Sequence, residues 1–193
     1  MHFTLADLVT DITQNGAESG ASLLELELRE SREAGKPAEF RFTVTDNGKG
    51  MTPEELKRAA DPFVTDGIKH PRRKVGLGLP FLIQTAEQSG GGWDIKSEKG
   101  KGTRVSAWFD ADNVDTPPAG DIPGMFRSIL LFQGPEEILI TRVRKNGTGD
   151  LDYQIRKTEL AGVLGDLEDT ASLILLGRYL RSLESGEDEG EDE

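Results

Sequence analysis

The sequence of 193 residues contains no cysteine. The chain therefore has no disulfide, no thiolate metal site and no cysteine nucleophile. Histidine is nearly absent too, since His2 and His70 are the two in the chain. Two histidines are too few for a histidine metal cluster, so that class of site is excluded as well.

Long apolar runs are also missing. No run approaches the roughly 20 residues that a membrane-spanning helix needs, and the N-terminus lacks the charged-then-apolar pattern of a signal peptide. The formal net charge of -12 at pH 7 argues against nucleic acid or an anionic membrane as a partner. We therefore expect a soluble, cytoplasmic protein.

Much of the negative charge is concentrated at the C-terminus, where residues 184–193 hold seven acidic side chains. Such a run, with no apolar residue to bury, predicts a disordered acidic tail at 186–193. Ending the chain at Leu183 is expected to remove charge but no packing residue.

The first 20 residues have the period of an amphipathic helix. Thr4 is a candidate N-cap, and the apolar residues that follow recur at one helical face: Leu5, Leu8, Val9 and Ile12. On the opposite face, Asp11 and Asn15 are one turn apart, so their side chains point the same way. This polar face is either a solvated surface or a functional pair.

Residues 22–30 and 39–45 alternate apolar and polar residues, which predicts two antiparallel strands. The second strand leads into the stretch DNGKGM at 46–51, and a helix is expected over 53–60, with Thr52 as N-cap and Pro53 in its first turn. A carboxylate at a strand end, followed by two glycines, lets a ligand approach the backbone closely. The simpler interpretation is a tight strand-to-helix turn.

The densest cationic stretch of the chain lies at residues 66–74, and VGLGLPF at 75–81 follows it. Glycines directly before a helix, with Pro80 in its first turn, present free backbone N–H groups that suit phosphate. The dinucleotide pattern GxGxxG fails because Phe81 stands where its third glycine belongs, and the Walker pattern GxxxxGK[ST] is absent from the chain. For the cationic loop itself, ordinary solubility remains the alternative.

The rest of the chain predicts a hairpin and a mixed C-terminal part. Residues 93–97 and 103–109 read as paired strands, and 110–121 as a linker. Three strands are then expected at 127–132, 137–144 and 151–156, followed by a short helix at 158–164. A last helix, capped by Asp169, carries a leucine stripe that predicts either core packing or a homodimer seam: Leu173, Leu176, Leu180 and Leu183.

Taken in order, these motifs resemble the GHKL superfamily of ATP-binding domains, which includes gyrase-type topoisomerases, large heat-shock chaperones, sensor histidine kinases and MutL-type mismatch-repair proteins. The stretch DITQNGAESGA at 11–21 looks like the N-box, DNGKGM the G1 box, VGLGLPF the G2 box and GKGT at 100–103 the last glycine box, with DPF at 61–63 between them. The resemblance covers about residues 4–110.

The resemblance implies a role for each matched residue. Asn15 would help to hold Mg²⁺, Asp46 would accept a hydrogen bond from the adenine amino group, and Thr103 would close the adenine site. Residues 64–75 would be the ATP lid. The other nucleotide contacts would come from the G1 box, the lid region and the G2 box: Gly48, Gly50, Met51, Phe63, Lys74, Gly76, Leu77, Gly78 and Leu79. Asp11 matches the position of the family's catalytic glutamate. Aspartate is one methylene shorter than glutamate, and this departure puts ATP hydrolysis in doubt.

The implied fold is an α/β (α+β) protein, a two-layer α/β sandwich of the Bergerat ATP-binding type. We expect this domain at 1–112, a small α+β extension at 113–185 and the acidic tail at 186–193. The implied function is that of a stand-alone bacterial protein that binds ATP and Mg²⁺. It would act as an ATPase or protein kinase on an unidentified protein partner or phosphoacceptor. The alternative is an ATP-gated protein-binding module with negligible turnover.

Overall fold

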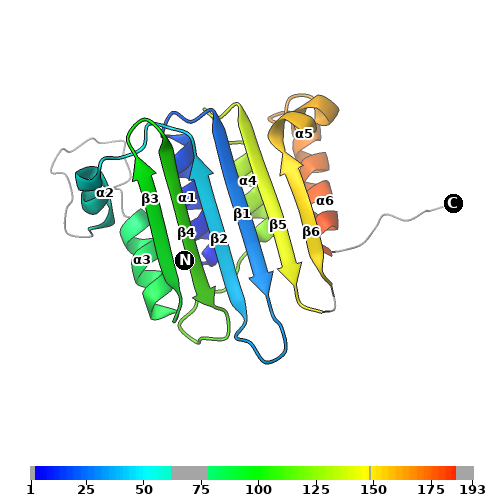
Figure 1. Ribbon diagram of the computed structural model, residues 1–193. Helices are drawn as coiled ribbons and strands as arrows, with labels where there is room; N and C mark the ends of the chain where they lie inside the picture. The colour runs from blue at the N-terminus through cyan, green and yellow to red at the C-terminus, as the bar shows by residue number, and fades with distance from the viewer. Residues whose placement is uncertain (1–2, 62–77, 148, 186–193) are drawn as a thin grey trace.

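The computed structural model describes residues 3–61, 78–147 and 149–185. They form a six-stranded sheet in the order β3-β4-β2-β1-β5-β6, with helices packed on one of its faces (Figure 1). The strands are β1 Leu23–Ser31, β2 Glu39–Asp46, β3 Gly92–Glu98, β4 Gly102–Asp110, β5 Glu137–Lys145 and β6 Leu151–Arg156. The helices are α1 Leu5–Ala17, α2 Pro53–Ala60, α3 Gly78–Gln88, α4 Ile122–Leu130, α5 Lys157–Leu164 and α6 Thr170–Ser185. The predicted α/β two-layer sandwich is confirmed.

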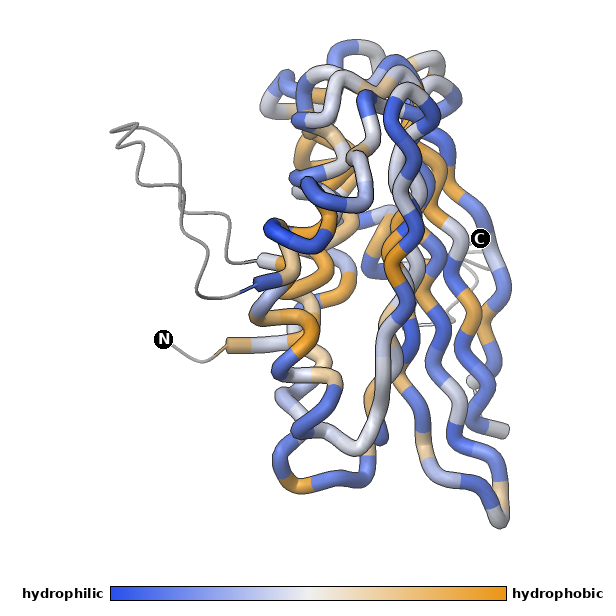
Figure 2. Tube along the Cα trace, turned by 60° about the vertical axis from the view of Figure 1, so that its left-hand side comes forward, coloured by the Kyte–Doolittle hydropathy of each residue, from blue (hydrophilic) through white to orange (hydrophobic). Residues whose placement is uncertain are grey.

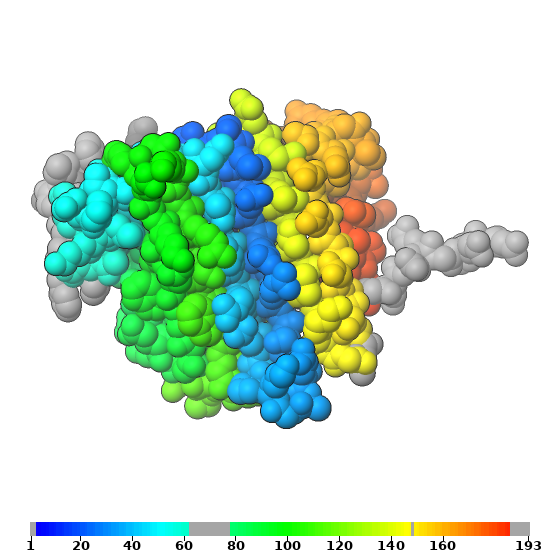
Figure 3. Space-filling view, in the orientation of Figure 1, coloured from blue at the N-terminus to red at the C-terminus, as the bar shows by residue number. Residues whose placement is uncertain are grey.

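The two layers follow from alternation along the strands. In β1, Leu24, Leu26 and Leu28 are buried under the helices, while Glu25 and Glu27 alternate with them and face the other side. Figure 2 shows the helical layer beside the sheet, and Figure 3 shows the sheet face that the described helices leave uncovered. One face of this sheet is therefore a core wall and the other is a polar surface.

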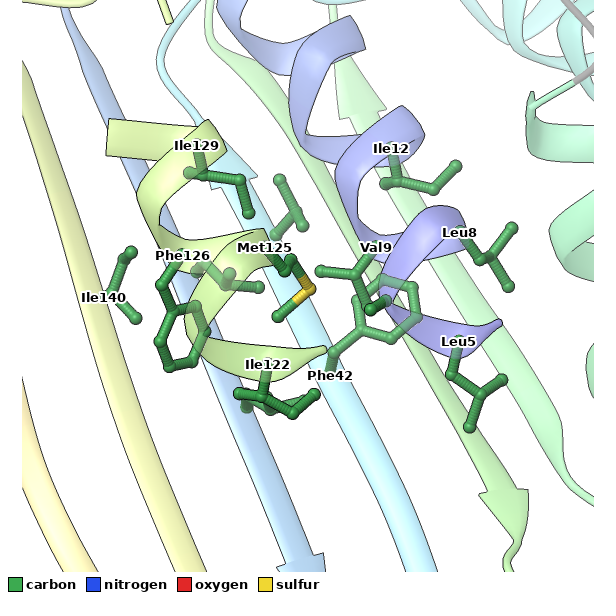
Figure 4. Packing of buried hydrophobic residues seen from close by; sticks show 14 of the residues in the cluster. Leu5, Leu8, Val9, Ile12, Phe42, Ile122, Met125, Phe126, Ile129 and Ile140 are labelled. Carbon is green, nitrogen blue, oxygen red and sulfur yellow. The ribbon is translucent and has the colours of Figure 1, made fainter. Parts of the chain in front are cut away.

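The core lies between the sheet and the two central helices. Figure 4 shows side chains of α1 and α4 meeting over the sheet residues Phe42 and Ile140. The helices supply Leu5, Leu8, Val9, Ile12, Ile122, Met125, Phe126 and Ile129, all buried. Helix α1 begins as predicted, because Thr4 Oγ1 accepts a hydrogen bond from the backbone N–H of Asp7 at 3.1 Å.

The prediction of a strand at 127–132 is wrong, since these residues belong largely to helix α4. Asp121 caps this helix by accepting a hydrogen bond from Gly124 N at 3.0 Å, and Pro123 lies in the first turn. Strands β4 and β5 both run parallel to β1, and parallel strands need a crossover connection, which is usually a helix. The predicted linker at 110–121 therefore leads into a core helix.

The other expected elements are confirmed. The strands at 22–30 and 39–45 pair as β1 and β2, the hairpin is β3 and β4, and 137–144 and 151–156 are β5 and β6. Strand β5 lies beside β1, with Leu23 opposite Glu137 and Ser31 opposite Lys145. The sheet therefore continues across residue 112, and the expected domain boundary there stays a prediction.

Helix α6 packs most of its predicted stripe into the core: Leu176 and Leu180 are fully buried and Leu183 packs against the core, whereas Leu173 is outside it. Its last turn is held by Arg142, whose side chain is 1% exposed. The Nε of Arg142 donates to Glu184 Oε1 at 2.9 Å and its Nη2 donates to Glu30 Oε1 at 2.8 Å. Glu184 is therefore a structural residue, and the expectation that nothing after Leu183 packs is wrong.

Candidate functional site

The residues of the glycine motifs meet where β2 ends, beside the last turn of α1 and the β3–β4 hairpin. Asp46 is the last residue of β2 and is 7% exposed. Its Oδ1 accepts hydrogen bonds from Gly48 N at 2.9 Å and from Ser19 Oγ at 3.0 Å. One carboxylate oxygen of Asp46 is thus fixed by the turn itself.

The other oxygen of Asp46, Oδ2, receives no hydrogen bond from any residue in the described ranges. Gly16 lets α1 pack closely at this point, because a Cβ at that position would lie 2.7 Å from Leu24 Cδ1 and 3.6 Å from Asp46 Oδ2. In the described part of the chain every buried side-chain oxygen has a hydrogen-bond partner, so Oδ2, which has none, is open to solvent. Asp46 Oδ2 is therefore available to a donor that the described residues do not supply.

Two glycines bring backbone segments together in a way that no side chain would allow. Gly50 has φ +57°, and a Cβ there would lie 1.9 Å from the carbonyl oxygen of Glu98. Gly102 has φ +107°, and a Cβ there would lie 1.9 Å from the carbonyl oxygen of Asp46. The loop after β2 is thus packed against the tip of the β3–β4 hairpin, backbone to backbone.

Two serines that the sequence analysis did not single out tie these segments together. Ser19 closes the C-terminal end of α1 onto Asp46, and its carbonyl oxygen accepts from Lys49 N at 3.1 Å. Ser97 in β3 accepts from Met51 N at 2.8 Å and shares a 2.8 Å hydrogen bond with the hydroxyl of Thr103. Thr103 lies directly opposite Asp46 in the β2–β4 ladder.

The sequence carried little signal for either serine. Ser19 falls inside the stretch at 11–21, but no spacing marks it there. Ser97 follows only from the hairpin register, which places it opposite Thr103. Only the pairing of β3 with β4 brings Ser97 next to Thr103, and the sequence pattern does not fix that register.

Asp11 and Asn15 lie on the exposed side of α1, one turn apart as predicted. Helix α3 begins beside Asn15, because a Cβ at Gly78 would lie 3.3 Å from Asn15 Nδ2. Within the described ranges, the side chains of Asp11 and Asn15 make no hydrogen bond or ion pair. The structure thus brings Asn15 and Gly78 together, with Leu79 in the same first turn of α3, half-buried against the core.

Helix α2 is fastened to the hairpin by an ion pair. Lys99 Nζ lies 2.9 Å from Glu55 Oε2, and the Thr52 backbone N–H also donates to that carboxylate. The Thr52 N–H, and then Lys99, hold the pKa of Glu55 below its usual value. The capping box of α2 thus also fixes the position of the loop that precedes it.

Some predicted site residues cannot be placed. Phe63, Lys74, Gly76 and Leu77, together with the expected lid at 64–75, lie outside the described residues. Within the described ranges, no group of three or more acidic, histidine or cysteine residues could hold a metal ion. A metal at Asn15 would therefore need most of its ligands from a bound molecule or from water.

Shallow depressions exist elsewhere, on the open face of the sheet. One is lined by Glu27, Arg29, Arg41, Thr43, Arg104 and Ser106. Thr43 and Ser106 share a 2.9 Å hydrogen bond at its base. These side chains project from the opposite face of β2 and β4 to Asp46 and Thr103, so the depression is no part of the Asp46 site.

Comparison with known proteins points to the same region. The model of the family described as histidine kinase-, DNA gyrase B- and HSP90-like ATPases matches residues 3–113. Sensor histidine kinase ZraS from Escherichia coli O157:H7 is 31% identical over 83 residues, covering 43% of this chain and 17% of that protein. Sensor protein SrrB from Staphylococcus aureus (strain NCTC 8325 / PS 47) is 40% identical over 62 residues, covering 31% of this chain and 11% of that protein. The chain thus spans less than a fifth of the length of either relative.

A solved structure, the histidine kinase domain from the Erythrobacter litoralis EL346 blue-light activated histidine kinase, is 22% identical to this chain. The match covers 48% of this chain and 35% of the chain of that structure, with a TM-score of 0.29. None of the helices in the described ranges is long and apolar enough to cross a membrane.

Proposed function

Because the chain belongs to the family of histidine kinase-, DNA gyrase B- and HSP90-like ATPases, we propose that it is a Mg²⁺-dependent protein that uses bound ATP to regulate a partner protein. The part that matches, residues 3–113, is an ATP-binding domain of this family. The relative named as a sensor histidine kinase supports phosphoryl transfer to a protein as the use of that ATP.

The observation that carries the proposal is the unequal surroundings of the Asp46 oxygens. Oδ1 is held by Gly48 N and Ser19 Oγ, whereas Oδ2 has no donor among the described residues. The adenine amino group is a donor of the right kind, and a carboxylate accepts such a bond strongly. In this proposal Asp46 binds adenine, with Gly48, Gly50 and Met51 lining the approach.

The phosphates would lie toward the start of α3. Gly78 is the first residue of that helix, where unpaired backbone N–H groups and the helix dipole favour anions. Leu79 in the same turn, with Gly76, Leu77, Phe63 and Lys74 before it, would complete the contacts. Asn15 lies beside Gly78, so in this proposal its side-chain amide lies near the phosphates.

The residues present fit a magnesium ion shared with the nucleotide. Mg²⁺ in nucleotide sites typically takes one or two protein oxygens and completes its octahedron with phosphates and waters. Asn15 can supply one amide oxygen, and its side chain is committed to no hydrogen bond within the described ranges. When bound, Mg²⁺ would neutralise phosphate charge; Asn15 would orient the phosphates, and Asp11, one turn earlier, would orient a nucleophile.

Calorimetric titration with ATP and GTP tests the base site. Asp46→Asn should weaken ATP binding by at least about tenfold, because losing a hydrogen bond to a charged group costs roughly 1.5–3 kcal/mol. The matched control is Asp110→Asn, because Asp110 Oδ1 also accepts from the N–H two residues on, at the end of β4. Equal affinities of the wild type for ATP and GTP, or equal effects of the two substitutions, would contradict the adenine role.

The same titration tests the metal. With Mg²⁺ removed by chelator, wild-type affinity for ATP should fall, and Asn15→Ala should already show the lower value in the presence of Mg²⁺. Gln14→Ala is the control, since Gln14 is the adjacent exposed residue of α1. An Asn15→Ala protein that still responds to chelator as the wild type does would show that Asn15 holds no metal.

A second function, an ATP-gated binding module with negligible turnover, has one observation in its favour. Asp11 is shorter than glutamate, and no described side chain holds it in place by a hydrogen bond or ion pair. Orienting the nucleophile is the residue-specific part of phosphoryl transfer. Phosphate release at saturating Mg-ATP, measured with and without a candidate partner, separates the two functions.

A further inference from the structure

We propose that Arg127 of α4 and Arg181 of α6 form, over Gly177, a binding site for a phosphate group carried by a phosphorylated side chain of the partner protein. The inference deepens the proposed function and rests on it for the partner, which the proposed phosphoryl transfer would leave phosphorylated. All three residues lie beyond residue 113, where the family match ends, so no motif of the family assigns them a role.

A glycine inside helix α6 opens the space that the two arginines share. Helix α6 packs against α4 in the helical layer (Figure 1), and Gly177 is buried midway along α6. Outside the backbone of its own helix and its chain neighbours, the atoms nearest to a Cβ built on Gly177 are guanidinium nitrogens. Arg127 Nη1 would lie at 3.6 Å, and Arg181 Nη1 and Nη2 at 3.6 Å and 3.8 Å. Guanidinium groups from two helices therefore converge on one point.

Close packing does not account for this glycine. Distances of 3.6–3.8 Å are ordinary van der Waals contacts, and they are made with the flexible ends of two side chains, so an alanine would fit. At Gly16, by contrast, a Cβ would lie 2.7 Å from Leu24 Cδ1 in the core. Glycine in a helix interior is less favourable than alanine. What Gly177 leaves open is the space between the two arginines.

Neither guanidinium group has an anionic partner in the part of the chain that the structure describes. Arg127 and Arg181 are exposed, and they make no hydrogen bond or ion pair there. Helices α4 and α6 hold a single carboxylate between them, that of Glu184, and it is bound to Arg142. Two like charges close together repel each other. An anion from outside the described residues would therefore stabilise the pair.

A phosphate group matches two guanidinium groups better than a carboxylate does. A phosphorylated side chain carries a charge of about −1.5 to −2 and three acceptor oxygens, and guanidinium groups bind phosphate through paired N–H donors. One carboxylate would neutralise one arginine and leave the other unpaired. In a chain of net charge -12, the two arginines form a local cationic site of the kind that recognises phosphorylated segments.

Amide NMR of the full chain tests the site, with inorganic phosphate and a short phosphoserine peptide as probes. Both probes should shift the Gly177 amide and saturate, and the unphosphorylated peptide should not. Arg127→Gln and Arg181→Gln should each weaken the binding of both probes by at least about tenfold, the effect of losing a hydrogen bond to a charged group. The matched control is Arg104→Gln, since Arg104 is an exposed arginine on the open face of the sheet with no ion pair in the described ranges.

A substitution of the glycine separates the site from the stability of the helix. Gly177→Ala should leave the melting temperature unchanged or higher, because alanine favours a helix. It should nevertheless weaken both probes, because its Cβ takes up part of the space between the two guanidinium groups. An unchanged affinity in Gly177→Ala would overturn the site, and so would binding of inorganic phosphate without binding of the phosphoserine peptide.

A chain of residues 1–185 distinguishes the phosphate group from the carboxylates at 186–193. Both chains should bind phosphate, whereas binding in the shorter chain alone would assign the arginines to those carboxylates and overturn the proposal. A Gly177 amide that shifts in neither chain, or arginine variants that bind like the wild type, would overturn it too. Asp46→Asn should leave phosphate binding at Gly177 unchanged, so a failure of the proposed ATP site and a failure of this site are told apart.

Discussion

At the scale of single residues, position on the sheet decides what a side chain can do. Ser97 and Ser106 each share a hydroxyl–hydroxyl bond with a threonine, at 2.8 Å and 2.9 Å. Ser106 lies at the base of a depression on the polar face, whereas Ser97 lies on the helix-facing side and reaches the loop after β2. The same pair of residue types is thus a packing detail on one face and part of the proposed site on the other.

In the proposed function, Asp11 is the residue on which ATP turnover would depend. A side chain roughly 1.5 Å shorter than glutamate holds a nucleophile less well, and a misplacement of about 1 Å can cost on the order of 100-fold in rate. We expect slow basal hydrolysis in the wild type. Asp11→Glu should raise it and Asp11→Asn should lower it, with ATP affinity nearly unchanged in both.

Phosphate release at saturating Mg-ATP measures this effect. Glu18→Gln, at the C-terminal end of the same helix, is the control and should leave the rate at the wild-type value. Identical turnover in wild type, Asp11→Glu and Asp11→Asn would show that Asp11 only solvates the helix.

At the scale of elements, α6 is held to the sheet by one buried charge as well as by its leucines. Arg142 is enclosed by Glu184, Glu30 and the carbonyl oxygen of Val143. The hydroxyl of Tyr153 also donates to Glu184. Burial, and then Glu184, raise the pKa of Tyr153, so the phenol stays protonated and keeps this bond. The network fixes the last turn of α6 against β5 and β6.

Two truncations that differ by two residues test that network. A chain ending at Ser185 keeps every contact of Glu184 and should unfold like the full chain. A chain ending at Leu183 leaves Arg142 buried with one carboxylate fewer, and breaking a buried pair costs about 3–5 kcal/mol.

Urea unfolding gives the free energy of both truncated chains. Glu184→Gln in the full chain, which removes the charge but keeps the helix end, should reproduce most of the loss. Equal stability of the two truncated chains would show that the ion pair does not hold the helix.

At the scale of the whole molecule, the family match and the folded unit have different extents. The match ends at residue 113, but β5 pairs with β1 along nine positions and α4 fills the middle of the core. Buried residues beyond 113 include Phe126, Ile129, Leu130, Ile138 and Ile140. The C-terminal part therefore completes the hydrophobic core against which α1 and the Asp46 strand pack.

A chain of residues 1–113 should consequently fail to fold. Each fully buried large apolar side chain contributes roughly 1.5–3 kcal/mol, so losing α4 alone approaches the 5–15 kcal/mol by which a typical protein is stable. The expected result is no cooperative thermal transition, with the chain of residues 1–185 as the folded control. A cooperative transition in 1–113 would instead support an independent domain ending near residue 112.

Much of the fold was predictable because its signals are local. The caps at Thr4 and Thr52, the alternation in β1 and β2 and the glycines around residues 46–51 depend on neighbours a few positions away. Asp46 at a strand end, and Asp11 and Asn15 on one helix face, followed from the same spacing rules. The sequence by itself determined these elements and the candidate residues that they carry.

Only the tertiary structure decided which elements meet. Residues 127–132 have the composition of a strand, but the parallel placement of β5 beside β1 needs a crossover, and the helix α4 provides it. Arg142 is hydrogen-bonded to Glu184, 42 positions away in the chain, and Ser97 is hydrogen-bonded to Met51, 46 positions away. Such contacts depend on sheet order and strand register, which arise from the packing of distant segments and leave no periodic trace in the chain.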